Sequence, residues 1–515
     1  MEKNTVYQFR DFLKVSNIEM KTCKKKVLII GGGTAGLTIA NNLQDSFDIK
    51  VIEKSKFKRY PIWYKIPLLI GLLFIKENKY ISKRDYFLTN GRRIPFFESN
   101  LLGGASVMNG CVHMLGNSSN WNSILKKFNS DYSELLRSYE KLFSLKIKDR
   151  NKIGLLSACQ NKIDFAFINA LNLQGIPSSN MIYSNEEGCG PIVNTIKKYF
   201  RTSVLSLIKK RNFDQILNEN VECLIFDKVG RVIGAKTSTK EFYSDYVILS
   251  AGVIGSCDLL LREKSRMSHN GGFLNNLNIG MNIKDHSNLR INVLTKNSIG
   301  SLNEISDSFF KKFLLLCKHF SGKPSLMRGT GATSAAHLDL DKDGVVETRI
   351  QIVHFSESGR AGSEGKLFNS NNPGFSISIT AINPKSKGTI KLDGSNNIVD
   401  PMYLSSKKDL EILKLALEFC MNLLKSPSFN KHILEIENEV EITNNPENYI
   451  NHNLYSGYHL IGGTSEVIDS DFKVNDIQGL YVCDASIFDR YAASNIHSSV
   501  ILISDIFSKF FIANK

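Results

Sequence analysis

The sequence of 515 residues predicts an α/β fold with two lobes. One is a discontinuous, Rossmann-like dinucleotide-binding domain, and the other is a substrate domain of antiparallel sheet plus helices. The first observation is a strand, glycine turn, helix and second strand that follow one another from Lys26 to Glu53. The second is a late strand, Asp245 to Leu249, which runs into another turn of small residues. This order is typical of a chain that returns to a sheet begun earlier. Two lobes fit the length, because single cores stop growing at about 250 to 300 residues.

The first glycine turn has the spacing of a dinucleotide fingerprint. Gly31 permits a tight turn, Gly33 lets the backbone approach a pyrophosphate, and Gly36 lets helix and strand pack closely. The acid that ends the second strand would bind a pair of ribose hydroxyls. The alternative is a structural turn that binds nothing. The cofactor-binding residues predicted here are Gly31, Gly33, Thr34, Ala35, Gly36 and Glu53.

The middle of the chain changes from a helical to a strand pattern. Asp131 to Leu145 has apolar residues at helical spacing, and strands follow at Val221 to Phe226 and Arg231 to Ala235, with a turn between them. We assign the dinucleotide-binding domain to residues 24–130, 196–290 and 450–515, and the substrate domain to residues 131–195 and 291–449.

Composition limits the partners and the compartment. The net charge of +15 is spread along the chain, which indicates a lysine-rich surface or an anionic partner and no nucleic-acid module. The longest apolar candidate for a membrane segment, Ile66 to Ile75, is shorter than the roughly 20 residues that a span needs. The first 25 residues lack the apolar core of a secretory signal. The nine cysteines are scattered, which favours reduced thiols. We therefore expect a cytoplasmic protein without a transmembrane segment.

An acidic stretch from Asp339 to Gly344 resembles the first half of a calcium loop. The acid required at the twelfth position is missing, because Ile350 stands there. A turn between the strands His337-Leu338 and Thr348 to Phe355 explains the stretch better. We predict a hairpin and no metal.

Polar residues cluster near the C-terminus, where Tyr458 to Thr464 contains His459, and Asp484 and Asn495 follow. An imidazole with a reference pKa of about 6.5 is suited to accept the proton of an alcohol. A neighbouring amide can donate a hydrogen bond to the oxygen as charge develops there. On its own this is only a polar cluster, but together with the dinucleotide fingerprint at the other end of the chain it points to flavin chemistry.

An ordered series of motifs over nearly the whole chain resembles the glucose/methanol/choline (GMC) oxidoreductases, a family of FAD enzymes that oxidise alcohols and sugars. Leu102 to Gly110 is similar to the family's L-G-G-S-S-x-x-N-G, and Ser250 to Ser256 is similar to its S-A-G-A-x-x-S. Gly280 to His286 resembles G-x-N-x-x-D-H. Ser386 to Leu392, followed by Asp400-Pro401, resembles the start of the family's C-terminal region.

The resemblance implies roles for individual residues. His459 stands at the first catalytic position and Asn495 at the second, with His497 as the alternative if the loop shifts by two residues. Further FAD contacts are implied for Gly103, Gly104, Ser106, Asn109, Gly110, Val221, Ala251, Gly252, Asp484 and Ala485.

Two departures from the family pattern bear on the cofactor. Glu98 to Leu101 stands where members usually carry an Arg-Gly pair ahead of the L-G-G motif. Met108 replaces the histidine through which some members attach the flavin, so we expect non-covalent FAD. His113 is the alternative attachment point, although a structural role suits it better, and Asp285-His286 is expected to fix a loop.

The implied activity is oxidation of a CH–OH group of an alcohol, sugar or polyol. The implied electron acceptor is dioxygen, a quinone or a redox protein, with a dehydrogenase preferred. Alternatives are a flavin-containing lyase of the same fold, a non-catalytic flavin-binding subunit, and a protein that binds NAD instead.

Overall fold

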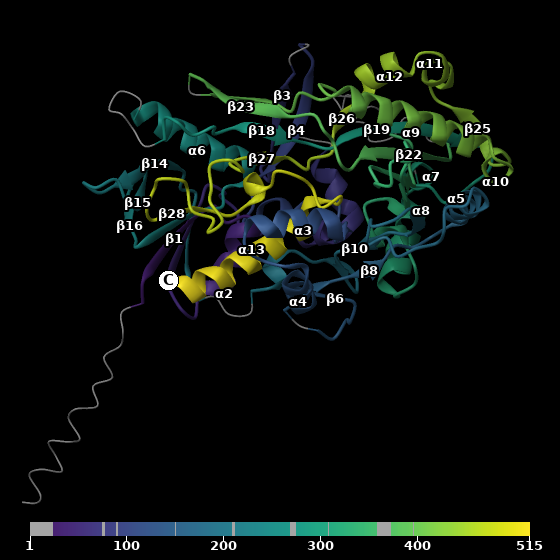
Figure 1. Ribbon diagram of the computed structural model, residues 1–515. Coiled ribbons are helices and arrows are strands. Elements are labelled where there is room, and N and C mark those ends of the chain that lie inside the picture. Colours follow the sequence, from purple (N-terminus) through teal and green to yellow (C-terminus); the bar gives the residue numbers. More distant parts are fainter. Residues whose placement is uncertain are drawn as a thin grey trace, which may run out of the picture.

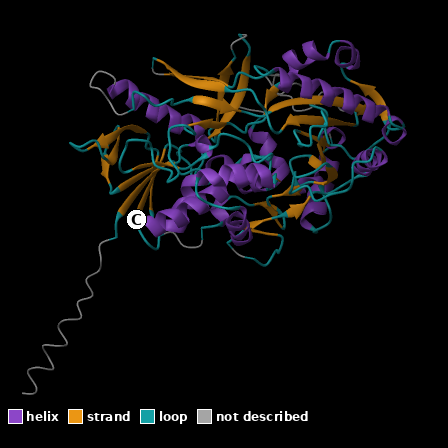
Figure 2. Cartoon of the chain, in the orientation of Figure 1, coloured by secondary structure: helices purple, strands orange, loops and turns teal. Residues whose placement is uncertain are grey.

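The computed structural model describes residues 24–74, 78–88, 91–149, 151–208, 212–267, 274–306, 308–357, 372–394 and 396–515. The predictions for the first 25 residues therefore lie almost wholly outside the described residues. Helices and strands alternate in one half of the molecule, whereas a broad antiparallel sheet with helices over it forms the other half (Figures 1 and 2). This arrangement confirms the predicted fold class.

The cofactor-domain sheet has five parallel strands in the order β13-β2-β1-β17-β28. Its central strands are buried on both faces, as is usual for parallel sheets covered by helices. The strands come from distant parts of the chain, so the predicted discontinuity is confirmed, whereas the boundaries of the domains remain predictions. The strands are β1 (Lys26–Ile30), β2 (Asp48–Glu53), β13 (Asp214–Leu217), β17 (Tyr246–Leu249) and β28 (Leu480–Val482).

The last helix, α13 (Ile496–Asn514), runs beside the fingerprint helix α2 (Thr34–Leu43) and beside α4 (Tyr132–Leu142) (Figure 1). By length and composition α13 is apolar enough to cross a membrane, so the longest apolar candidate is α13 and not Ile66 to Ile75. Two-thirds of its apolar window is nevertheless buried inside the protein. Its Asp505 accepts hydrogen bonds from Asn42 and Lys141. These contacts identify α13 as a core helix.

Short segments surround the cofactor domain. A three-stranded antiparallel sheet contains β14, β15 and β16, and it confirms the two strands and the turn predicted after Val221. Within the apolar stretch that begins at Ile66, Pro67–Leu73 forms a short 3₁₀ helix. The bounds are β14 (Val221–Phe226), β15 (Val232–Thr237), β16 (Glu241–Tyr243), β3 (Ile81–Phe87), β4 (Arg93–Ser99), α3 (Ser118–Lys127) and α6 (Gly252–Met267).

The substrate-domain sheet has the order β25-β19-β22-β21-β20-β9, and β26 pairs with β19. Its strands are antiparallel and almost entirely buried, and α9 packs on β22 (Figure 1). The bounds are β9 (Gly188–Pro191), β19 (Ser287–Thr295), β20 (Ala332–Leu338), β21 (Thr348–Val353), β22 (Gly374–Ala381), β25 (Ile433–Ile436), β26 (Tyr455–Ser456), α5 (Lys162–Leu173), α8 (Phe309–Phe320), α9 (Lys407–Lys425) and α12 (Pro446–Asn453).

A four-stranded sheet of order β24-β23-β18-β27 connects the two halves. β18 (Met281–Lys284) pairs with β27 (Ile461–Gly463), while β23 (Gly388–Asp393) pairs with β24 (Asn396–Asp400). The residues that follow β18 and precede β27 therefore lie side by side. This pairing brings the loop of His286 to the loop of His459.

Candidate active site

The first glycine turn has the shape that a dinucleotide needs. Gly31 has φ +106°, and a Cβ there would lie 2.4 Å from the Ser250 carbonyl oxygen. A Cβ on Gly36 would lie 1.9 Å from the Gly31 oxygen, so side chains are excluded at both positions. At Gly33 a Cβ would meet nothing within 4 Å. Gly33 is also the N-cap of α2 and supplies no side-chain cap, which leaves the helix N-terminus open toward the approach of a phosphate group.

The second glycine turn lies directly on the first. The Gly103 N–H donates to the Gly32 oxygen at 2.8 Å, and Gly104 approaches the Gly33 Cα so closely that a Cβ would lie 3.0 Å from it. Glu53 points into the same turn, where its carboxylate accepts from the N–H groups of Gly32 and Ser55. Two motifs predicted separately thus form one cradle, and its open glycine surface fits an FAD pyrophosphate.

Asp484 joins two segments beside this cradle, its own and the turn that begins α6. One carboxylate oxygen accepts from the Gly252 N–H at 2.9 Å and from the Ser256 hydroxyl at 2.6 Å, and the other accepts from the Ser486 N–H at 2.8 Å. Burial raises the pKa of Asp484, although these hydrogen bonds oppose the shift. The predicted residues Ala251, Gly252, Asp484 and Ala485 therefore lie together at the ends of β17 and β28.

The remaining predicted cofactor residues surround the second turn. Ser106 donates to the Gly103 oxygen at 2.7 Å, and Thr330 donates to the Gly110 oxygen at 2.9 Å. Asn109 accepts from the Cys111 N–H at 3.1 Å, and Arg201 donates to the Asn109 backbone oxygen. Val221 begins β14, farther along the chain.

The two departures from the family pattern have local explanations. Glu98 lies on β4 and forms ion pairs with Arg84 at 2.8 Å and Lys54 at 3.5 Å. Its charge is therefore compensated within the protein. Met108 is buried, and His113 is hydrogen-bonded through Nε2 to the Tyr139 hydroxyl at 2.9 Å. That contact suits the expected structural role of His113.

The backbone of His459 is held on both sides. Its N–H donates to Asp285 Oδ1 at 2.8 Å, and its carbonyl accepts from the Tyr491 hydroxyl at 3.0 Å. Asp285 also accepts from the hydroxyls of Ser456 and Tyr403. Asp285 thus fixes a loop, as expected, and that loop carries the candidate base.

The ring of His459 has a defined partner at each nitrogen. Nδ1 lies 2.9 Å from His286 Nδ1, and Nε2 lies 3.1 Å from Asn495 Nδ2. Arg349 donates from Nη1 to Asn495 Oδ1, and because a guanidinium can only donate, it fixes the orientation of the amide. The Asn495 NH₂ group therefore faces Nε2, which must carry a lone pair. The ring proton is on Nδ1 and is donated to His286.

Electrostatics keep this imidazole neutral. Burial, together with the positive charge of Arg349, lowers the pKa of His459 to about 3. Burial, together with the neighbouring His459 ring and Arg349, holds the pKa of His286 well below its usual range. At neutral pH both rings are uncharged, and Nε2 of His459 is able to accept a proton.

The structure separates Asn495 from His497, the alternative left open by the sequence. Asn495 contacts His459, whereas His497 makes no hydrogen bond to His459 among the described residues. Burial and then the charge of Arg201 lower the pKa of His497 to about 4. The charge of His497 in turn contributes to the lowered pKa of His113. His497 thus belongs to the neighbourhood of Arg201 and His113.

Two contacts of the site were not predicted from the sequence. Arg349 lies on β21, about 110 residues before His459 in the chain, in a strand without a recognisable motif. His286 was assigned to loop fixing, although its motif precedes β19 in a loop that the pairing of β18 with β27 brings to His459. Only the pairing of the strands, which a single sequence does not show, brings these two residues to the site.

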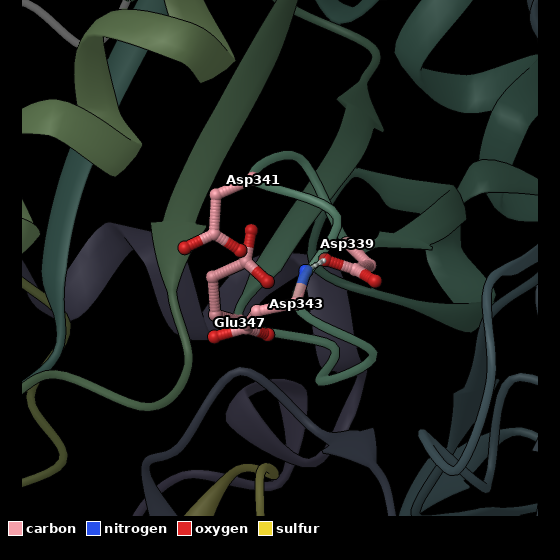
Figure 3. Close-up of side chains that lie close together, drawn as sticks. All are labelled: Asp339, Asp341, Asp343 and Glu347. Atoms are coloured by element: carbon pink, nitrogen blue, oxygen red, sulfur yellow. Dashed lines mark hydrogen bonds between the residues drawn. The ribbon is translucent and has the colours of Figure 1, made fainter.

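The acidic stretch forms the predicted hairpin between β20 and β21, and its carboxylates converge (Figure 3). Ligand atoms of Asp339, Asp341, Asp343 and Glu347 lie within 4.8 Å of one another, and Glu347, at the ninth position, was not anticipated. Lys408 at the start of α9 pairs with Asp341 at 3.0 Å and with Asp343 at 2.7 Å. A lysine thus supplies positive charge in this loop, and the absence of a metal there remains a prediction.

Comparison with known proteins gives consistent similarities. Residues 384–504 match a family model described as GMC oxidoreductase. An oxygen-dependent choline dehydrogenase from Vibrio vulnificus is 24% identical over 93% of this chain and 92% of its own. A glucose dehydrogenase [FAD, quinone] from Drosophila pseudoobscura pseudoobscura is 21% identical over 93% and 85%.

Solved structures resemble the fold over almost the whole chain. A pyridoxine 4-oxidase from Mesorbium loti superposes with a TM-score of 0.78 and 19% identity, covering 95% of this chain and 100% of the other. A formate oxidase from Aspergillus oryzae gives 0.82 and 17%, covering 96% and 99%. At these identities the likeness shows a shared fold.

Proposed function

The chain belongs to the GMC oxidoreductase family, and from this premise we propose that it is an FAD-dependent oxidoreductase acting on a CH–OH donor. The observation that carries the proposal is the hydrogen-bonded pair of His459 and Asn495 at the end of the loop fixed by Asp285. Relatives named as choline and glucose dehydrogenases support a donor of the alcohol type. FAD, bound non-covalently against the two glycine turns, supplies the acceptor for the hydride that leaves the donor carbon.

His459 and Asn495 act on different atoms of the donor's hydroxyl group. In the structure Asn495 Nδ2 donates directly to His459 Nε2. A donor hydroxyl replaces this contact with two: its oxygen accepts from Asn495 Nδ2, and its proton is donated to Nε2. His459 then removes the proton while Asn495 stabilises the charge that develops on oxygen.

His286 and Arg349 keep this pair in its working state. His286 accepts the Nδ1 proton of His459 and so holds the lone pair on Nε2, where the hydroxyl arrives. Arg349 holds the Asn495 amide with its NH₂ group toward the hydroxyl. Both are positioning residues for the proton transfer.

The electron acceptor and the compartment belong to the same proposal. We assign a quinone or redox protein as acceptor in preference to dioxygen, because a source of peroxide would be harmful in a cytoplasmic protein. The described cysteines are all free thiols, which supports a reducing compartment.

The test uses the absorption spectrum of the purified protein under anaerobic conditions. We expect a yellow flavoprotein whose band is bleached by one class of alcohol, sugar or hydroxy acid. His459→Ala is expected to keep the colour and to slow bleaching by a factor of about 10² to 10⁴. A colourless protein would favour NAD, and a yellow protein that nothing bleaches would favour a lyase or a non-catalytic subunit.

A further inference from the structure

We infer that the donor carries a carboxylate next to its hydroxyl-bearing carbon, and that Arg349 binds this carboxylate. The inference rests on the proposed function and adds to it the chemical class of the substrate, a hydroxycarboxylic acid. The product is the corresponding oxo acid: the O–H proton goes to His459, the C–H hydride leaves with both electrons to FAD, and a C=O bond forms.

The first observation is a buried charge without a counter-ion. Arg349 is 4% exposed, and no carboxylate of the described part of the chain lies within ion-pair distance of its guanidinium. Its recorded contacts, the Asn495 oxygen and the Met114 sulfur, are both neutral. Burial alone lowers the pKa of Arg349, to about 10, so the group stays charged at neutral pH. A buried cation of this kind is costly unless an anion joins it.

Another arginine of the same sheet shows what this protein does with a structural guanidinium. The side chain of Arg290 on β19 is only 8% exposed, and it pairs with the equally covered carboxylate of Glu357 at 2.5 Å. Arg349 has no equivalent of Glu357 among the described residues. Arg201 is also buried without an ion pair to any of them, but it donates to the backbone oxygens of Val107 and Asn109, whereas Arg349 donates to one side-chain amide and to a sulfur.

The second observation is the place of the charge relative to the reacting atoms. Only the Asn495 amide separates the guanidinium from the His459 imidazole. A donor whose hydroxyl lies between Asn495 and His459 therefore has its next carbon or two within reach of Arg349. This geometry selects a carboxylate close to the hydroxyl, as in 2- or 3-hydroxy acids.

The third observation concerns the space beside the guanidinium. A cavity of about 10 Å³ is lined by Arg349, His113, His337 and Met114, among others. Arg349 Nε and His113 Nδ1 are buried without a hydrogen-bond partner in the part of the protein that the structure describes. The cavity admits about one oxygen-sized group. Neither His459 nor Asn495 lines it, so it shows free space at the guanidinium and not a pocket for the whole donor.

The field of Arg349 also selects against cationic donors. Burial is the main cause of the lowered pKa values of His459, His286 and His337, and the charge of Arg349 lowers all three further. A quaternary ammonium alcohol would place a second positive charge in the same low-dielectric space. We therefore expect choline to be a poor donor, despite the similarity of this chain to choline dehydrogenases.

The experiment compares matched donors on the FAD-loaded protein. A 2-hydroxy acid, its amide, the corresponding diol and choline are tested for flavin bleaching, and the non-oxidisable parent carboxylate is tested for binding by its effect on the flavin spectrum. We expect kcat/KM for the acid to exceed that for its amide by a factor of about 100, because a site built for an anion rejects an analogue without one. Bleaching that is equal for the acid, its amide and the diol would overturn the inference and leave the proposed function intact. Absence of bleaching by every donor would count against the proposed function itself.

Variants separate recognition from simple loss of activity. Arg349→Met slows all donors because Asn495 loses its support, so the decisive readout is the ratio of kcat/KM between acid and amide. We expect this ratio to fall below about 10 in Arg349→Met and to be partly kept in Arg349→Lys, which retains the charge but not the planar fork. Arg490→Gln, at an exposed arginine paired with Asp489, is the control and should keep the wild-type ratio. An unchanged ratio in Arg349→Met would overturn the inference. If that variant does not fold, the comparison of donors on the wild-type protein decides.

Discussion

Nδ2 of Asn495 lies 3.1 Å from Nε2 of His459, so the amide is placed as a donor toward the nitrogen that must accept the substrate proton. The contact exists because Arg349 orients the amide by donating to its oxygen. The protonation state of the candidate base therefore depends on a residue of another sheet. Several measurable properties follow from this chain of contacts and from the groups around it.

The pH dependence of catalysis should depend on Arg349. Because the pKa of His459 is lowered to about 3, kcat/KM should show no acid limb between pH 5 and 7. Burial is the larger cause of this low pKa and remains in Arg349→Met, so loss of the positive charge should raise the pKa of His459 only part of the way and move the acid limb to higher pH than in the wild type. Arg349→Lys keeps the charge and should keep the flat profile. Identical pH profiles in Arg349→Met and in the wild type would contradict this account of the site.

The glycine turn offers a matched pair of substitutions. Gly33→Ala adds a methyl group that meets no protein atom, so we expect a folded protein that has lost FAD. Gly36→Ala places its methyl group 1.9 Å from the Gly31 oxygen, so we expect a folding defect of several kcal/mol. Flavin content and thermal unfolding of the apoprotein separate the two effects. Full flavin content in Gly33→Ala would show that the pyrophosphate lies elsewhere.

Acid should destabilise the protein through its buried histidines. Burial lowers the pKa values of His113 and His337 to about 3, and that of His286 lies well below 6.5. The unfolded chain binds these protons below pH 6.5 and the native protein does not, so stability falls as the pH falls. Each such group contributes about 1.4 kcal/mol per pH unit. Thermal unfolding from pH 7 to pH 5 measures the slope. His337→Leu should reduce it, and His452→Gln, at the surface, should leave it unchanged.

Glu347 should have the opposite pH signature. Burial, with the charges of Asp341 and Asp339, raises its pKa to about 7. Its contribution to stability is present below its unfolded pKa of about 4.3 and is lost as the pH rises through 7. Glu347→Gln should therefore stabilise the protein at pH 8, by about 2 kcal/mol more than at pH 5.5. Glu435→Gln, on an exposed part of β25, is the control.

Thermal unfolding also tests the role of Lys408 in the acidic loop. Because Lys408 already pairs with Asp341 and Asp343, we expect calcium at about 5 mM to leave the melting temperature unchanged. A calcium-dependent rise in the wild type that Glu347→Gln abolishes would show instead that the loop binds the ion.

The sequence predicted what depends on neighbours in the chain. The fingerprint from Gly31 to Gly36, the strand before Gly252 and the loop of His459 are local patterns, and each lies where expected. It did not predict Arg349 or the contact of His286 with His459. These contacts depend on which strands pair. A single sequence does not show which residues strand pairing will bring together. Glu347 was not predicted because the calcium-loop pattern has its last acid at the twelfth position, whereas Glu347 stands at the ninth.

The strand order of the cofactor sheet also affects how the protein is made. β1 is synthesised long before β28, Asp484 and α13. Until those residues follow, the nascent chain lacks the helix that packs beside the fingerprint and the carboxylate that holds the turn at Gly252. During that time the apolar edge of β17, with which β28 pairs, is exposed. Chaperones should therefore bind the nascent chain before α13 is made, and FAD should be loaded only afterwards.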